Sequence, residues 1–143
     1  MNNLNIYQKI NQAQGGVEAI VKSNLNKFQS YKYFTEYQAL TIIRPLLTKH
    51  GLTLTFSDSN EELIINELTD QKGSKNWVVK YKKLAILTNI DQPAEQLTFN
   101  FWAMGQNADI AKAKGSADTY AVKYFLSKFF LIPITDNLDA DNR

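Results

Sequence analysis

Positively charged and aromatic side chains alternate at two places in this 143-residue sequence. In one, Lys27 and Lys32 flank Tyr31 and Tyr33; the other is the segment 77–82. Single-stranded nucleic acids are held by cations that contact phosphates and by flat rings that stack on bases. This alternation favours a surface for single-stranded nucleic acid. The cations expected to contact phosphates are Lys32, Arg44, Lys80, Lys82, Lys112, Lys114 and Lys123, with Lys27, Tyr31 and Tyr33 beside them.

Each aromatic ring has a second interpretation, which is packing in the core. Core packing is the expectation for Trp77, Tyr81, Phe99, Phe101, Tyr124 and Phe125, because apolar residues recur around them at strand or helix spacing. For Tyr31 and Tyr33 both interpretations stay open. The lysines, fourteen of the sixteen cations, could also serve only to keep the protein in solution.

The residue types argue against catalysis. There is no cysteine and one histidine, so a thiolate metal site, a thiol nucleophile and a histidine cluster are excluded. The adjacent Glu61 and Glu62 would point to opposite faces of a strand, and no phosphate-binding loop follows the required order. We therefore expect a protein that is not an enzyme and that uses neither a cofactor nor a metal.

Two further classes are disfavoured by composition and charge. No apolar run approaches the roughly 18 residues that a membrane helix needs, and the first residues lack the pattern of a secretory signal. A cytoplasmic protein without a membrane partner is the expectation. The net charge of +2 hides an acidic segment at 51–70, which carries five acidic residues and no cation.

Helical spacing dominates the first 50 residues. Apolar residues predict one short helix ending at Gly15 and a second over 17–28. Thr35 and Gln38 form a capping-box pattern that opens a third helix, and Gly51 suits its left-handed end. Pro45 inside this helix should kink or divide it.

After Gly51 the spacing changes to strand alternation, which predicts an antiparallel meander of about four strands over 52–104. The inward-facing phase is expected to flip near Lys82 and Lys83, as at a bulge. A polar loop at 105–109 then leads to one long helix from Ile110, whose small residues allow close packing on the sheet and whose exposed side carries Lys112 and Lys123. The prediction is a single α+β domain over 1–143, with N-terminal helices and a loose acidic tail at 134–143.

The order of several short motifs resembles the ERF (essential recombination function) family of bacteriophage and prophage single-strand annealing proteins. The motifs are Tyr31-Lys32-Tyr33, Ile43-Arg44-Pro45-Leu46-Leu47 before His50-Gly51-Leu52, and Gly105 and Asp109 before the segment 117–126. The resemblance implies ATP-independent binding of single-stranded DNA and annealing of complementary strands in homologous recombination. It also implies a ring or filament of many copies in the bacterial cytoplasm, and a host or phage single-strand binding protein as a further partner.

The resemblance also suggests that Gly105, Asp109 and Lys112 form part of a DNA groove. Alternatively, Gly105 serves a turn and Asp109 caps the helix. The main alternative function is an α+β scaffold that binds a protein or a small ligand and has no enzymatic activity. A metal-dependent nuclease is the least favoured interpretation, because ligand clusters are missing.

Overall fold

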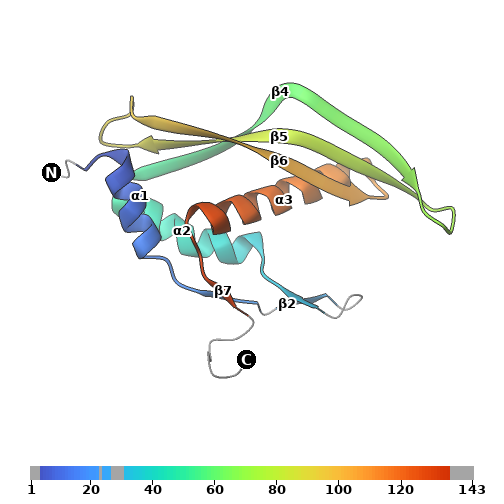
Figure 1. Cartoon of the computed structure of the whole chain (residues 1–143), viewed down its shortest axis with the longest axis horizontal. Helices are drawn as coiled ribbons and strands as arrows, with labels where there is room; N and C mark the ends of the chain where they lie inside the picture. Colours follow the sequence, from blue (N-terminus) through green and yellow to red (C-terminus); the bar gives the residue numbers. More distant parts are fainter. Residues whose placement is uncertain (1–3, 23, 27–30, 136–143) are drawn as a thin grey trace.

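A computed structural model describes residues 4–22, 24–26 and 31–135 of the chain (Figure 1). The elements in order are α1 (Ile6–Gly15), β1 (Ile20–Val21), β2 (Asn24–Asn26), β3 (Tyr31–Tyr33), α2 (Glu36–His50), β4 (Leu52–Thr69), β5 (Lys75–Asn89), β6 (Gln96–Asn107), α3 (Ile110–Phe129) and β7 (Ile134–Thr135).

The main sheet has the order β4-β5-β6 and is antiparallel. Figure 1 shows it as a long curved layer with α3 against one face and α2 beyond α3, while no described helix covers the opposite face. We call the face toward α3 the inner face and the other the outer face. The predicted α+β fold, a meander packed by a long C-terminal helix, is confirmed, but the described meander has three strands instead of four.

The missing strand boundary lies inside β4. A meander of four strands would need a strand boundary between Phe56 and Leu63, yet the chain passes through this stretch in one direction and keeps pairing with β5. Asp58 pairs with Lys83 and Leu63 with Tyr81, so five steps along β4 stand against two along β5. The irregularity predicted near Lys82 therefore lies on the neighbouring strand.

The inward phase of β5 does not flip. Val79, Tyr81, Lys83, Ala85 and Leu87 are all buried and alternate without interruption. The flip was expected because the apolar Leu84 and Ile86 stand at even positions, but the inner face continues through Lys83, which is only 6% exposed.

The capping predictions for α2 are confirmed. Thr35 and Gln38 form a reciprocal capping box, and Gly51 ends the helix with a φ of 67°. Pro45 lies within α2 and does not divide it. The helix predicted over 17–28 is wrong: β1 and β2 occupy part of that range, β1 pairs in parallel with β7, and β2 pairs with β3. Ile134 and Thr135 thus belong to a strand, and the rest of the expected tail lies outside the described residues.

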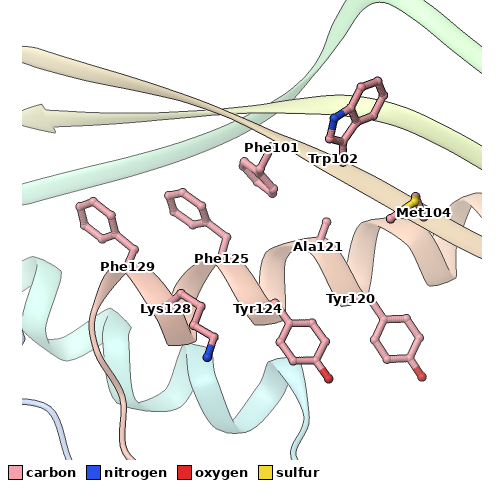
Figure 2. Close-up of a pocket in the computed structure, with 9 residues that line it drawn as sticks. All are labelled: Phe101, Trp102, Met104, Tyr120, Ala121, Tyr124, Phe125, Lys128 and Phe129. Atoms are coloured by element: carbon pink, nitrogen blue, oxygen red, sulfur yellow. The ribbon is translucent and has the colours of Figure 1, made fainter.

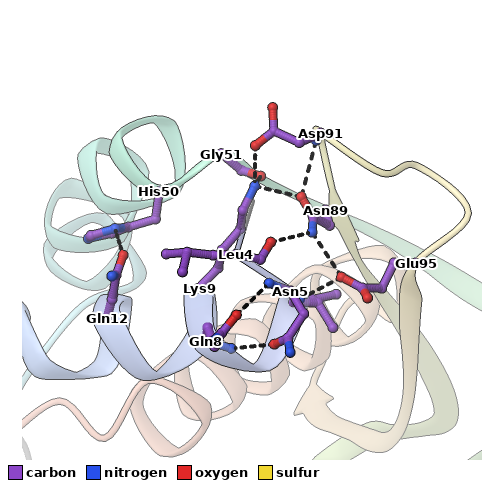
Figure 3. Close-up of polar contacts among 11 residues, drawn as sticks. Leu4, Asn5, Gln8, Lys9, Gln12, His50, Gly51, Asn89, Asp91 and Glu95 are labelled. Carbon is purple, nitrogen blue, oxygen red and sulfur yellow. Dashed lines mark hydrogen bonds and ion pairs between the residues drawn. The ribbon is translucent and has the colours of Figure 1, made fainter. Parts of the chain in front are cut away.

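A buried lysine joins α1 to the sheet (Figure 3). The Lys9 side chain is fully buried, and its ammonium lies 2.5 Å from the Asp91 carboxylate and 2.6 Å from the Asn89 side-chain oxygen. It also donates to the carbonyl of Gly51 at 3.3 Å. Because a buried ammonium needs such partners, these contacts fix α1 against the β5–β6 turn.

The sheet and α3 approach closely at Gly105. A Cβ atom on this residue would lie 2.6 Å from the backbone nitrogen of Ala117 and closer still to the carbonyl oxygen of Ala113. The facing helix positions are the fully buried Ala113 and Ala117. The prediction that small residues let α3 pack tightly is confirmed. Gly105 itself belongs to β6 and serves this approach, so the expected loop and turn are wrong there.

Among the described helices, none combines the length and the apolar character required to cross a bilayer.

Candidate nucleic-acid interface

The first cluster of cation and rings surrounds Lys123 on α3. Its ammonium lies 4.7 Å from the ring centroids of Phe34 and Tyr120, 4.9 Å from that of Tyr124 and 5.9 Å from that of Tyr33. It donates a hydrogen bond to the carbonyl of Phe34 at 3.0 Å. We call Lys123, Tyr33, Tyr120 and Tyr124 the α3 cluster. In this cluster α3 and β3 together supply the two kinds of group that a nucleic-acid site needs, a cation and aromatic rings.

The charge of Lys123 is poorly compensated. The residue is 4% exposed, and no carboxylate within the described residues forms an ion pair with it. Burial lowers the pKa of Lys123, and the nearby charge of Lys22 lowers it further. Lysine at this position was predicted on the exposed side of the helix with Lys112. That placement is wrong, because Tyr33 at the end of β3 and Phe34 after it lie against the Lys123 side chain.

Two rings of the α3 cluster face outward. Tyr120 and Tyr124 stack one helical turn apart, with centroids 6.4 Å apart and planes 13° from parallel, and are 47% and 49% exposed. Tyr124 was expected in the core, so this prediction is wrong. Exposed parallel rings beside an ammonium can stack on bases while the charge attracts phosphates.

A second cluster lies on the outer face of the sheet. Lys80 and Lys82 place their ammonium groups 4.7 and 5.1 Å from the ring centroid of Trp102, which is 43% exposed. Strand register explains the arrangement, since Lys82 pairs with Trp102 across β5 and β6. We call these three residues the outer-face cluster. Lys80 and Lys82 thus lie on the face opposite the buried Tyr81.

Lys114 is engaged in a different contact. It lies 2.9 Å from Asp58 and 3.1 Å from Asp118, and buried Lys83 pairs with the same two carboxylates. Tyr81 donates a hydrogen bond to Asp118. Two cations and two anions thus neutralise one another beside the irregular part of β4, so Lys114 is less available to a phosphate than the sequence suggested.

The pKa directions agree with a closed ion-pair network. Burial alone would raise the pKa of Asp58 and Asp118, but hydrogen bonds from lysines, and from Tyr81 to Asp118, outweigh it and lower both. Burial opposes the charge of Lys114, yet its bonds to the two carboxylates raise its pKa. Burial and then Asp118 raise the pKa of Tyr81. Asp58, Asp118 and Lys114 are therefore charged at neutral pH.

An open apolar groove runs between β6 and α3 (Figure 2). Its volume is about 580 Å³. Figure 2 shows Phe101, Trp102 and Met104 on the strand side and Tyr120, Tyr124 and Lys128 on the helix side. The groove thus separates the α3 cluster from the outer-face cluster, and members of both line it.

The other predicted residues are dispersed. Arg44 is exposed on α2 and lines a separate hollow with Tyr37 and Leu54. Lys112 is exposed in the first turn of α3, where Asp109 is the N-cap, as one alternative proposed. Tyr31 and Lys32 lie in β3, and Lys27 lies outside the described residues.

Three members or neighbours of the clusters were missed as binding residues in the sequence. They are Tyr120, Trp102 and Lys22. The spacing of Tyr120 and Tyr124, four residues apart, is a signal that could have identified the stacked pair. The position of Trp102 on the face of Lys82 required the register of β6.

The described residues contain no group of three or more histidine, cysteine, aspartate or glutamate side chains that could hold a metal ion. The fold places the chain in a class of α+β proteins in which one long helix covers one face of a curved antiparallel sheet. The chain belongs to the ERF superfamily, whose sequence profile matches residues 6–143. Members of this family are phage recombination proteins of the single-strand annealing type and are not classical enzymes. A search among individually curated proteins gives no significant match.

Proposed function

We propose that this protein binds single-stranded DNA and anneals complementary strands without ATP, in phage homologous recombination in the bacterial cytoplasm. Family membership supports the process, and the α3 cluster carries the proposal for the molecule. A buried ammonium that lacks a carboxylate partner among the described residues is stabilised when an anion arrives. Tyr120 and Tyr124 offer exposed ring faces at the same place.

The proposed mechanism is capture of the sugar-phosphate backbone. Lys123 and Lys22 attract phosphates to the α3 cluster, Tyr120 and Tyr124 stack on one or two bases, and the remaining bases stay available to a second strand. Lys112, Arg44, Lys27 and Lys32 are proposed to extend the positive path. Base stacking in the new duplex supplies about 1.4 kcal/mol per step, so no nucleotide hydrolysis is needed. A single copy spans few nucleotides, and we therefore propose that many copies assemble on a strand.

The test combines binding and annealing. Wild-type protein is mixed with two labelled complementary oligonucleotides without ATP, and duplex formation is followed by fluorescence transfer. Replacing Tyr120 and Tyr124 with alanine should weaken binding about 10-fold or more, because base stacking on one ring contributes roughly 1–3 kcal/mol. Tyr7→Ala is the matched control, since Tyr7 is 65% exposed on α1 and lies outside both clusters and the proposed positive path. Equal binding by wild type and the double variant would contradict the role of the α3 cluster.

The outer-face cluster is tested separately through salt. Each phosphate contact on a single strand adds about 0.7 to the slope of log affinity against log salt. Replacing Lys80 and Lys82 with glutamine should lower that slope by about 1.4 if both bind phosphates. The control is Lys72→Gln with Lys75→Gln, because these lysines lie at the far β4–β5 turn. An unchanged slope in the Lys80 and Lys82 variant would remove the outer-face cluster from the DNA path.

A scaffold that binds a protein or a small ligand is the second candidate function, and the apolar groove favours it. Failure to bind any oligonucleotide, together with a single-copy mass in solution, would favour this candidate over annealing.

A further inference from the structure

We propose that copies of this chain join through the two edges of the main sheet, with β4 of one copy pairing alongside β6 of the next. The inference rests on the proposed assembly of many copies and names the surfaces that make it. Within the described residues, β4 and β6 each have one side without a strand partner. An unpaired edge exposes a row of backbone donors and acceptors that a second strand can satisfy.

The β6 edge lacks the usual protection against such pairing. Exposed edge strands are commonly blunted by charged side chains or proline, yet none of the twelve residues from Gln96 to Asn107 is charged and none is proline. The edge carries Trp102 and Met104, which are 43% and 57% exposed. The apolar groove of Figure 2 runs beside it. The β6 edge is therefore open to pairing with another strand.

The β4 edge offers a complementary surface. Leu63 and Ile65 pair with Tyr81 and Val79 and therefore share their inner face, but they are 58% and 42% exposed because α3 does not cover them. If β4 of a second copy extends the sheet at β6, these two side chains lie on the α3 side, where the groove is. We assign them to the strand side of the groove, which Phe101 lines, so that the rings of Tyr120 and Tyr124 on the helix side remain available to bases.

Charge supports the same pairing. β4 contains four acidic residues and no cation: Asp58 and Glu67 pair with lysines of the same copy, and Glu61 and Glu62 line a hollow with Lys82. The surroundings of β6 are positive, since Lys128 lines the groove and the ammonium groups of Lys80 and Lys82 lie over Trp102. A contact between β4 and β6 therefore brings no like charges together, whereas a contact between two β4 edges would place Glu61 and Glu62 of both copies side by side.

Strand direction decides the kind of assembly. Both β4 and β6 are antiparallel to β5, so they run in the same direction within one copy. A neighbouring copy that keeps its helices on the same side of the extended sheet must place its β4 parallel to β6. Such a contact uses two different surfaces and leaves one free edge at each end, which generates a ring when the rotation closes and a filament when it does not.

The experiment uses two variants, each blocked at one edge, in the absence of DNA. The β4-edge variant carries Leu63→Lys and Ile65→Lys, and the β6-edge variant carries Met104→Glu and Lys128→Glu. All four side chains are exposed in the single copy. The control carries Ile90→Lys and Leu131→Lys, which are exposed apolar residues outside both edges. Mass is measured by light scattering after size exclusion.

Wild type and control should be larger than a dimer, and each edge variant alone should be a monomer. An equimolar mixture of the two variants should form a one-to-one dimer and nothing larger, because the intact β6 edge of one binds the intact β4 edge of the other. A monomeric wild type, an edge variant that assembles like wild type, or a mixture that stays monomeric overturns the proposal. If an edge variant shows no cooperative thermal transition, the single substitution I65K replaces the β4-edge variant or M104E replaces the β6-edge variant. The same outcomes then support or overturn the proposal.

The same samples separate this inference from the proposed function. Wild type that assembles as described but fails to bind an oligonucleotide contradicts DNA binding and leaves the interface standing. Wild type that anneals strands while both edge variants keep its size contradicts the interface and leaves annealing standing.

Discussion

The close approach of Gly105 to α3 gives the sharpest prediction for stability. In Gly105→Ala the new Cβ would lie 2.6 Å from the backbone nitrogen of Ala117. The atoms that it meets belong to helix backbone, so no side-chain rotation can relieve the clash, and α3 must move away from β6. Overpacking of this kind costs about 1–3 kcal/mol, and the rigid partner places this variant at the upper end, about 3 kcal/mol.

This loss converts to a melting temperature. The entropy of unfolding is about 2.1 cal/mol/K per residue, or about 0.3 kcal/mol/K for a chain of this length, so 3 kcal/mol corresponds to a fall of about 10 °C. The matched control is Gly115→Ala in the same helix, where an added Cβ meets nothing within 4 Å. Alanine in a helix interior is more stable than glycine by about 0.5–1 kcal/mol, so the control should melt about 2–3 °C higher. Circular dichroism and urea unfolding measure both. A Gly105→Ala protein that melts within 2 °C of wild type would refute the packing argument.

Three further predictions concern buried and paired charges. Lys9→Met should lower the free energy of unfolding by about 2 kcal/mol, because the hydrogen bonds of its ammonium to Asp91 and Asn89 are lost. Urea unfolding measures this loss, and Lys49→Met at an exposed position is the control. The folded-state pKa of Lys123 lies below its unfolded value of 10.5, so wild type should gain stability relative to Lys123→Met as pH rises toward 10.5; a constant difference across pH would contradict the burial of its charge. The pKa values of Asp58 and Asp118 are lowered in the folded state, so their stabilisation is present above about pH 4 and is lost as pH falls below it, and this acid loss should be smaller in Asp118→Asn.

Local signals were sufficient where neighbouring residues determine the structure. Thr35 with Gln38, Gly51 and Asp109 mark helix ends through contacts within four residues, and all three cap the expected helices. The alternation after Gly51 likewise predicted the strands. Burial of one face of a strand places apolar residues at every second position, and this pattern does not depend on which residues cover that face.

The predictions failed where distant residues decide burial. Lys83 faces inward, where no lysine was expected, because its charge is satisfied by Asp58 and by Asp118, 35 residues away. Lys123 looked exposed by helical spacing, but its acceptor is the carbonyl of Phe34, 89 residues earlier. A lysine in a sequence does not show whether such a partner will face it. The candidate site was therefore predicted in its residue types, whereas the grouping of Lys123 with Tyr120 and Tyr124 required the fold.

The short parallel pair of β1 and β7 affects how this chain reaches its final shape. Ile20 lies beside Ile134, and Val21 lies beside Thr135. During synthesis the meander and α3 can form from contiguous segments, but β1 has to wait until almost the whole described chain has left the ribosome. Contacts between such distant residues close large loops and slow folding. The amides of Ile20 and Lys22, which donate to the carbonyls of Pro133 and Thr135, should therefore be among the last to acquire protection from hydrogen exchange after refolding begins.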